Sequence, residues 1–96
     1  MAECYQIRYA AQAADDVRGL RAFDRKLIVE LIEQHLLFEP TRISRSKIER
    51  MEQPFWSQYR LRGGDFRVYY DVDEPARIVL VVRVLYKGVK HTEEKP

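Results

Sequence analysis

The sequence predicts a one-domain α+β protein in which two N-terminal helices pack on one face of a small, mainly antiparallel four-stranded sheet. Three observations support this fold class. Apolar residues alternate with a strand period at the start of the chain and through its second half, and follow helical spacing in between. The Gly63-Gly64 dipeptide separates two strand-like runs and indicates a hairpin. The chain has 96 residues without a repeat or a linker, so we expect residues 1–96 to form a single domain in the order β-α-α-β-β-β.

The first half of the chain is expected to supply one strand and both helices. Tyrosine and isoleucine alternate with polar residues over positions 5–9, which predicts a short half-buried strand, and helical spacing follows over positions 11–20. Asp24 is a favourable N-cap for a second helix that runs to about Phe38. The buried stripe of this helix is predicted to comprise Leu27, Ile28, Leu31, Ile32 and Leu36. His35 lies within that stripe, and we interpret it as a packed rather than a catalytic histidine.

The second half is expected to form the other three strands, over residues 55–62, 66–73 and 78–87. A looser turn over residues 73–77 joins the last two. The segment before them, residues 41–54, is basic and irregular, and its sequence fits a turn of helix or a loop equally well.

Alternation within the strands divides them between two faces of the sheet. If Gly63-Gly64 is the hairpin loop, Arg62 pairs with Asp65, and Arg60 lies directly opposite Arg67. In the last strand, the residues predicted to enter the core are Ile78, Leu80, Val82, Val84 and Tyr86. The face turned away from the helices, called the open face below, is predicted to carry Arg8, Arg60, Arg62, Arg67, Arg83 and Lys87, with Trp56 and Tyr69 among them.

The charge distribution favours an anionic partner for this open face. The net charge is only +2, but residues 40–70 hold seven Lys/Arg against three Asp/Glu, a balance of +4. Asp65 and Asp71 are the acidic residues predicted on the open face, so its positive excess is uncompensated. Aromatic side chains beside such cations can stack on bases.

Several classes of protein are disfavoured by composition. No apolar stretch approaches the roughly 20 residues of a membrane-spanning helix, and the N-terminus lacks the layout of a signal peptide. Cys4 is the one cysteine and cannot form an internal disulfide, and no Cys/His cluster has metal-ligand spacing. We therefore expect a cytoplasmic protein without a metal or another cofactor.

The stretch from Trp56 to Tyr70, WSQYRLRGGDFRVYY, resembles the central hairpin of the toxins of the RelE/ParE superfamily. In those toxins a strand ending in Leu-Arg meets a Gly-containing turn, followed by an aromatic residue, Arg and a Val/Tyr-rich strand. The predicted strand order and paired helices also fit. RelE-like members enter the ribosomal decoding site and cleave messenger RNA.

The resemblance implies roles for individual residues. Arg67 follows the turn and would contact the scissile phosphate, Arg60 matches a basic residue of the first hairpin strand, and Lys87 is nearest to a basic residue at the end of the last strand. Two positions depart from the pattern. Gln58 stands where ribonuclease members often carry lysine, and the C-terminal tail lacks a catalytic tyrosine that some members have, which leaves His91 as the nearby group able to exchange protons near neutral pH.

The reaction implied by the resemblance is attack of the RNA 2′-hydroxyl on its own phosphodiester. Arg67 and Arg60 suit the stabilisation of the phosphorane, because a guanidinium is always charged and grips two phosphate oxygens. Proton transfer would fall to Tyr69, Lys87 or His91. The side chains expected to bind RNA around this centre are Arg8, Arg45, Lys47, Trp56, Arg62 and Arg83.

Three functions are compatible with the sequence. The first is a toxin that acts as a ribosome-dependent messenger RNA endonuclease and inhibits translation. The second is a non-enzymatic inhibitor of DNA gyrase resembling ParE, and the third is an inactive superfamily member that serves as a binding module. In each case the resemblance implies an antitoxin as partner, and in the first case also the ribosome and messenger RNA.

Overall fold

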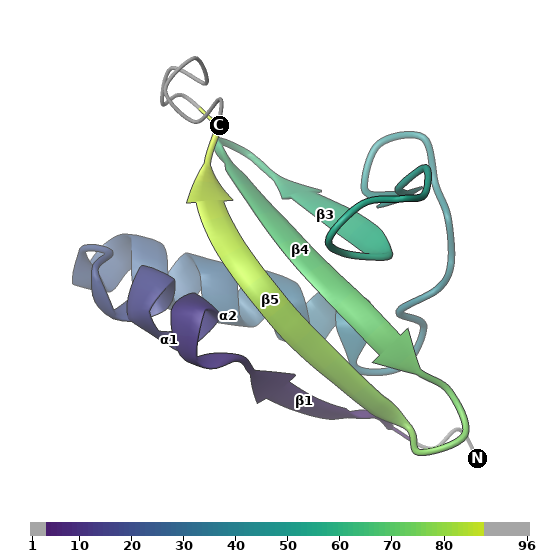
Figure 1. The fold of residues 1–96 in the computed structure, drawn as a ribbon. Coiled ribbons are helices and arrows are strands. Elements are labelled where there is room, and N and C mark those ends of the chain that lie inside the picture. Colours follow the sequence, from purple (N-terminus) through teal and green to yellow (C-terminus); the bar gives the residue numbers. More distant parts are fainter. Residues whose placement is uncertain (1–3, 88–96) are drawn as a thin grey trace.

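The computed structural model describes residues 4–87 and shows two helices followed along the chain by most of a five-stranded sheet (Figure 1). The elements are β1 (Gln6–Tyr9), α1 (Ala11–Arg18), α2 (Ala22–Leu36), β2 (Ile48–Arg50), β3 (Tyr59–Gly63), β4 (Phe66–Asp73) and β5 (Ile78–Tyr86). The strand order is β1-β5-β4-β3-β2, with β1 parallel to β5 and every other pair antiparallel. The predicted fold class is confirmed, but the sheet has one strand more than expected.

The additional strand, β2, comes from the basic segment whose conformation the sequence left open. Ser44 holds the turn that precedes β2, because its hydroxyl accepts hydrogen bonds from the backbone N–H groups of Lys47 and Ile48, at 3.0 and 3.2 Å. Ile48 then inserts into the core with 4% of its surface exposed, and β2 pairs with β3 along one edge of the sheet.

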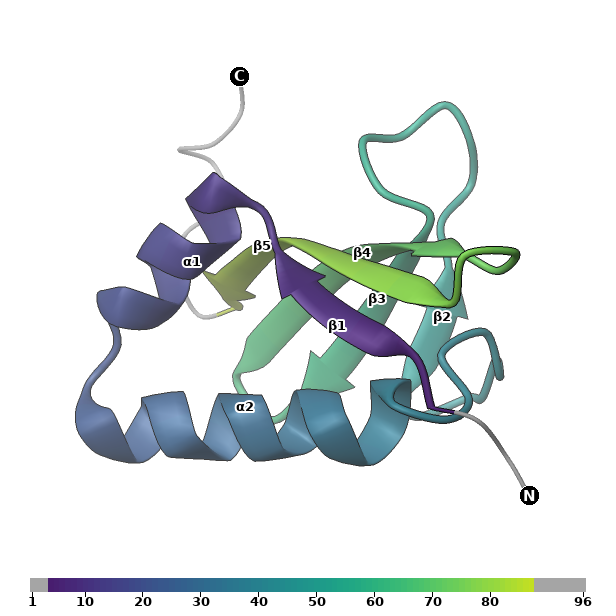
Figure 2. The same cartoon turned by 90° about the horizontal axis from the view of Figure 1, so that it is seen from below.

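Helix α2 lies beneath one side of the sheet, α1 lies beside β5 at the edge that β1 leaves unpaired, and the side opposite α2 is not covered by a helix (Figure 2). Helix α2 begins at Ala22, after Arg21, whose side chain makes no capping bond. The prediction of Asp24 as N-cap was therefore wrong: Asp24 lies in the first turn, where its negative charge interacts favourably with the helix dipole.

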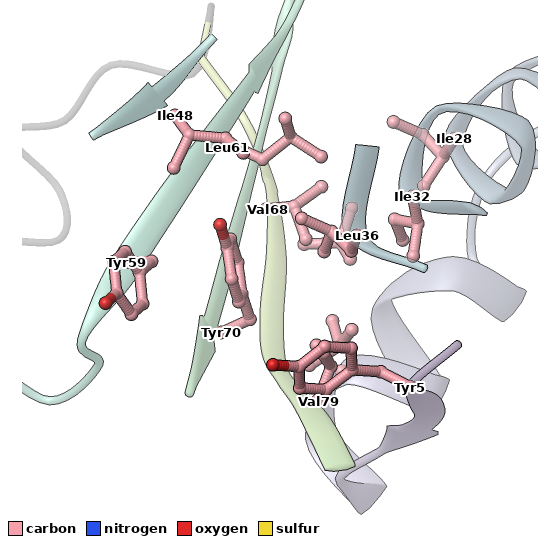
Figure 3. Close-up of a cluster of buried hydrophobic side chains, with 13 residues drawn as sticks. Tyr5, Ile28, Ile32, Leu36, Ile48, Tyr59, Leu61, Val68, Tyr70 and Val79 are labelled. Atoms are coloured by element: carbon pink, nitrogen blue, oxygen red, sulfur yellow. The ribbon is translucent and has the colours of Figure 1, made fainter. Parts of the chain in front are cut away.

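The buried stripe of α2 is narrower than predicted. Ile28, Ile32 and Leu36 are at most 2% exposed and point toward the sheet (Figure 3). Leu31 is partly buried, whereas Leu27 is 48% exposed and does not belong to the core. Each fully buried aliphatic side chain contributes about 1.5–3 kcal/mol relative to exposure, so these three positions hold the helix on the sheet.

The centre of the core is Tyr70 of β4, which is fully buried. Its ring stacks on that of Tyr59, with centroids 5.4 Å apart, and its hydroxyl donates a 2.6 Å hydrogen bond to the carbonyl of Pro40. Burial, and then the nearby Tyr59, raise the pKa of the Tyr70 hydroxyl above its usual range, so it remains a neutral donor. This bond fastens the chain after α2 to the middle of the sheet.

The β3–β4 hairpin turns one residue later than predicted. Gly63 pairs with Phe66, so the two loop residues are Gly64 and Asp65. Gly64 adopts φ +59°, the left-handed conformation that glycine tolerates best. Gly63 matters for a different reason, because a Cβ there would overlap the Leu31 side chain of α2, which would have to move.

The later turn changes the cross-strand partners but not the faces. Arg62 lies opposite Arg67, and Arg60 lies opposite Tyr69, so the predicted Arg60–Arg67 and Arg62–Asp65 pairs were wrong. The partner of each residue shifted by two positions, and side chains two positions apart share a face of a strand.

Strand β5 contains an irregularity that alternation did not reveal. Tyr69 pairs with Arg83 and Tyr70 with Val81, so Val82 is an extra residue, a β-bulge. Before it, Val79 and Val81 are fully buried, whereas Leu80 is 37% exposed. The predicted assignment of Ile78, Leu80 and Val82 to the core was therefore wrong. Val84, beyond the bulge, is buried as predicted, but Tyr86 is 46% exposed.

Candidate functional site

The predicted open face exists, and its centre lies where β3 and β4 pair. Arg60 and Arg62 project from β3, beside Arg67 and Tyr69 of β4. Their sequence positions place them on this face because the alternating residues Tyr59, Leu61, Val68 and Tyr70 are buried on the other.

A carboxylate that the sequence did not place here neutralises part of this charge. Glu49 of β2 lies opposite Arg60, and its Oε1 accepts hydrogen bonds from Arg60 at 2.6 Å and Arg62 at 3.4 Å. These bonds lower the pKa of Glu49, with the Arg60 hydrogen bond as the main cause. Glu49 is consequently ionised at neutral pH and is a weak proton acceptor.

Arg60 is the most enclosed arginine of this group, with 24% of its side chain exposed. Burial opposes its charge, but the hydrogen bond to Glu49 and the proximity of Tyr69 outweigh that effect and raise its pKa. Its Nε is buried and has no hydrogen-bond acceptor among residues 4–87.

Arg67 is in a different state. Its Nη1 donates to the backbone carbonyls of Gly64 and Phe66, at 3.0 and 2.9 Å, and within the described part of the chain no carboxylate lies within ion-pairing distance. Partial burial lowers the pKa of Arg67, and so do the charges of Arg60 and Arg62. Since a guanidinium remains protonated at neutral pH, Arg67 presents a positive charge that no carboxylate of residues 4–87 pairs with directly, although Asp65 is near enough to act on it.

An aromatic cluster stands beside these arginines. Trp56 stacks on Phe55 with centroids 4.8 Å apart and lies 4.5 Å from the ring of Tyr69. Trp56 is 50% exposed, although large aromatic side chains are usually well covered. The loop that carries Phe55 and Trp56 rises on the side of the sheet away from α2 (Figure 2).

Gln58 holds this loop against β4. Its backbone N–H donates to the carboxylate of Asp71 at 2.7 Å, and its side-chain oxygen accepts the N–H of Val72 at 2.8 Å. The predicted strand over residues 55–62 therefore begins only at Tyr59. The glutamine that departs from the expected lysine is thus used to position the aromatic cluster.

Arg83 was expected to bind RNA, and the structure gives it a partner within the protein. Its Nε and Nη2 donate to the two carboxylate oxygens of Asp16 on α1, at 2.8 and 3.0 Å, and Asp16 also accepts the backbone N–H of Val84 at 2.9 Å. The hydrogen bonds to Asp16 raise the pKa of Arg83.

The remaining predicted site residues are dispersed. Arg8 is exposed on β1, Arg45 is exposed in the loop before β2, and Lys87 is exposed after β5. Lys47 lies beside α2, where burial, and secondarily the Lys47 charge, lower the pKa of His35. His91 lies outside the described residues.

The open face is therefore equipped to bind a phosphate and to stack a base. Within residues 4–87, it contains no histidine, and no group of His, Cys, Asp and Glu in that part of the chain could hold a metal ion. Neither helix found between residues 4 and 87 has the length and apolar character needed to span a bilayer. Glu49, Asp16 and Phe55 are the site residues that sequence reasoning missed, and no local pattern identified them.

Comparison with known proteins identifies the family of this chain. Residues 7–88 match the family model described as the ParE toxin of the type II toxin–antitoxin system parDE. No curated protein sequence matches the chain.

Solved structures resemble it at low sequence identity. A chain of the toxin–antitoxin complex RelBE2 from Mycobacterium tuberculosis superposes with a TM-score of 0.76 and 23% identity, over 88% of this chain and 92% of that one. A chain of the archaeal RelE–RelB complex from Pyrococcus horikoshii gives 0.70 and 21%, over 88% and 97%. A double arginine-to-alanine mutant of the E. coli toxin RelE, in the free state, gives 0.65 and 22%, over 99% and 94%. These likenesses establish the fold, and the family model spans most of the chain: the protein belongs to the ParE toxin family of type II toxin–antitoxin systems, within the RelE/ParE superfamily.

Proposed function

We propose that this toxin acts on messenger RNA at the ribosome, cleaving it and thereby inhibiting translation. The observation that carries the proposal is Arg67, a charged guanidinium without a carboxylate partner among the described residues, next to an exposed aromatic cluster. Phosphate neutralisation and base stacking are the two interactions by which a single-stranded RNA is held.

In the proposed complex, Arg67 contacts the scissile phosphate and stabilises the charge that develops on it. Arg62, which lies opposite Arg67 and is only partly neutralised, adds a second cation. Trp56 and Tyr69 stack the adjoining base. Tyr69 and Lys87 remain the candidates for proton transfer within the described chain, and we propose His91 as a third.

The weakness of this proton-transfer set explains why the ribosome is part of the proposal. Arginine cannot act as a base at neutral pH, and Glu49 is held ionised by Arg60, which makes it a poor one. Catalysis would therefore rely on positioning, with ribosomal RNA orienting the 2′-hydroxyl in line with the phosphate. We also propose a cytoplasmic site of action and an antitoxin that covers this cationic face.

A second candidate is inhibition of DNA gyrase without catalysis. It is favoured by the family model, which is that of ParE, and by the neutralisation of Arg60 and Arg83 by Glu49 and Asp16. A surface that only binds a protein needs no free catalytic group.

Primer extension on a reporter message separates the two candidates. The purified toxin is added to a reconstituted translation reaction, with ribosomes included or omitted. We expect cuts within codons only when ribosomes are present, and we expect Arg67→Ala to abolish them. The control is Arg18→Ala, which removes an equal charge from an arginine of α1 that is 70% exposed.

An uncut message, with both variants behaving as the wild type, would contradict the RNA proposal. A gyrase supercoiling assay with the same proteins then tests the second candidate. A toxin that leaves both message and gyrase untouched would be an inactive family member that serves as a binding module.

A further inference from the structure

The two carboxylates that pair with arginines of the sheet differ in how completely they are bound. Asp16 uses both oxygens for Arg83 and takes a backbone N–H as well, and its side chain is 13% exposed. Glu49 uses only Oε1, which it shares between Arg60 and Arg62, and its side chain is 40% exposed. The Asp16 pair is therefore part of the framework, whereas the Glu49 carboxylate is accessible to solvent and held from one side.

The arginines around Glu49 are also incompletely satisfied. A guanidinium has five N–H donors in a fixed fork. Arg60 gives one strong bond to Glu49, and its buried Nε has no acceptor among the described residues. Arg62 reaches the same oxygen only at 3.4 Å. A single carboxylate oxygen thus serves two guanidinium groups that could bind a larger anion with more oxygens.

Phosphate is such an anion, and Arg67 can attract it to the site of Arg60 and Arg62. Arg67 lies directly opposite Arg62 and pairs with no carboxylate of the described residues, so a phosphate attracted by Arg67 arrives next to the shared oxygen of Glu49. The charges of Arg60, Arg62, Arg67 and Glu49 sum to +2 before any ligand binds.

We propose that Glu49 is an internal substitute for a phosphate, which occupies the anion site of Arg60 and Arg62 in the free protein and yields it to a phosphate of the bound strand. This inference rests on, and extends, the proposed RNA-binding function. Glu49 then acts as a specificity-determining residue. Because it occupies Arg60 and Arg62, a nucleic acid that binds non-specifically can use Arg67 but not these two arginines. The anion site of Arg60 and Arg62 becomes available only when a bound strand places a further phosphate over β3, where it can displace Glu49.

Titration with inorganic pyrophosphate tests the anion site without RNA. The readout is the chemical shift of the arginine Nε–Hε cross-peaks of the isotope-labelled full-length protein. In the wild type, we expect Arg67 to respond while Arg60 does not. In Glu49→Gln, which keeps the shape of the side chain but removes its charge, we expect both to respond. The matched control is Glu52→Gln, an exposed residue of the loop after β2 without an ion pair in the described chain.

Two results would overturn the inference. One is an Arg60 cross-peak that moves in the wild type as far as that of Arg67, since the site would then already be open. The other is an Arg60 cross-peak that stays in place in Glu49→Gln. If Glu49→Gln loses cooperative unfolding, Glu49→Asp replaces it, because shortening the side chain by a methylene should open the same site.

Binding of a fluorescein-labelled single-stranded RNA, measured against salt concentration, connects this site to function. We expect Glu49→Gln to bind several-fold more tightly, with a salt slope steeper by about 0.7, the value of one additional phosphate contact on a single strand. Unchanged affinity and slope in Glu49→Gln would also count against the inference. If the pyrophosphate result holds but RNA binding is independent of Arg67, the proposed function fails and the anion site stands.

Discussion

Asp16 of α1 and Arg83 of β5 form a two-pronged ion pair, with Nε–Oδ2 and Nη2–Oδ1 distances of 2.8 and 3.0 Å. The same carboxylate accepts the N–H of Val84, beyond the point where β1 stops pairing with β5. The Asp16 side chain therefore provides an acceptor for a backbone N–H of β5 that β1 leaves unpaired, and it fastens α1 to the sheet.

This arrangement predicts that Asp16 and Arg83 stabilise the fold jointly. Asp16→Asn should lower the free energy of unfolding by about 1–3 kcal/mol, because it weakens bonds to a guanidinium that is one-third exposed. Arg83→Ala should cost a similar amount, and the double variant less than the sum. Urea denaturation of the four proteins measures the coupling.

The neighbouring Asp15 provides the control, since its pair with Arg18 lies on the surface and Asp15→Asn should cost less than about 0.5 kcal/mol. Strictly additive costs for Asp16→Asn and Arg83→Ala would show that the pair contributes no stability of its own.

The contact between Gly63 and Leu31 predicts a second coupling. Gly63→Ala should destabilise by about 1–3 kcal/mol through overpacking, because its Cβ would overlap the Leu31 side chain. In Gly63→Ala/Leu31→Ala the overlap is absent, so the double variant should cost less than the two single changes together. Gly64→Ala, by contrast, should cost about 1–2 kcal/mol through its positive φ, irrespective of Leu31, since no atom lies near its Cβ position. Thermal unfolding monitored by circular dichroism distinguishes the two mechanisms.

The exposed fractions along α2 predict unequal costs for similar truncations. Ile32→Ala should destabilise by about 2–5 kcal/mol, because it leaves a cavity in the core. Leu27→Ala removes a side chain that is 48% exposed and should cost under about 0.5 kcal/mol. Equal midpoints of chemical denaturation for the two variants would mean that α2 packs on the sheet with a different face.

His35 should make stability depend on pH near neutrality. Burial, and then the Lys47 charge, hold its pKa below the unfolded value of 6.5. As the pH falls through 6.5, the unfolded chain takes up a proton before the folded chain does, so stability present above that pH is lost on acidification. His35→Gln should flatten this part of the profile. The second histidine of the chain supplies the comparison, and an effect that disappears in His91→Gln instead would refute the assignment.

Sequence reasoning placed most of the open face correctly, for a reason that the hairpin illustrates. The turn was misplaced by one residue, which moved the partner of each strand residue by two. Because side chains repeat every second position, Arg60, Arg62 and Arg67 kept the predicted face while every pair among them changed. Faces are therefore more robust to such an error than contacts are.

The parts that failed depend on long-range geometry. Glu49 and Asp16 were not identified because each meets its arginine through the fold, from a three-residue strand and from a helix far away in the chain. Leu27 has the same residue type as Leu31, and only the placement of α2 over β3 separates them. In β5, both faces are apolar around the bulge, so alternation gave no warning of Val82.

Val82 also marks a position in β5 at which the number of residues can change without changing the faces of the strand. Its neighbours on either side, Val81 and Arg83, pair with consecutive residues of β4. Removing Val82 would leave a regular ladder in which Arg83 still faces outward and Val84 still faces the core. A protein with this sheet can therefore gain or lose one residue here without exchanging its interior for its open face.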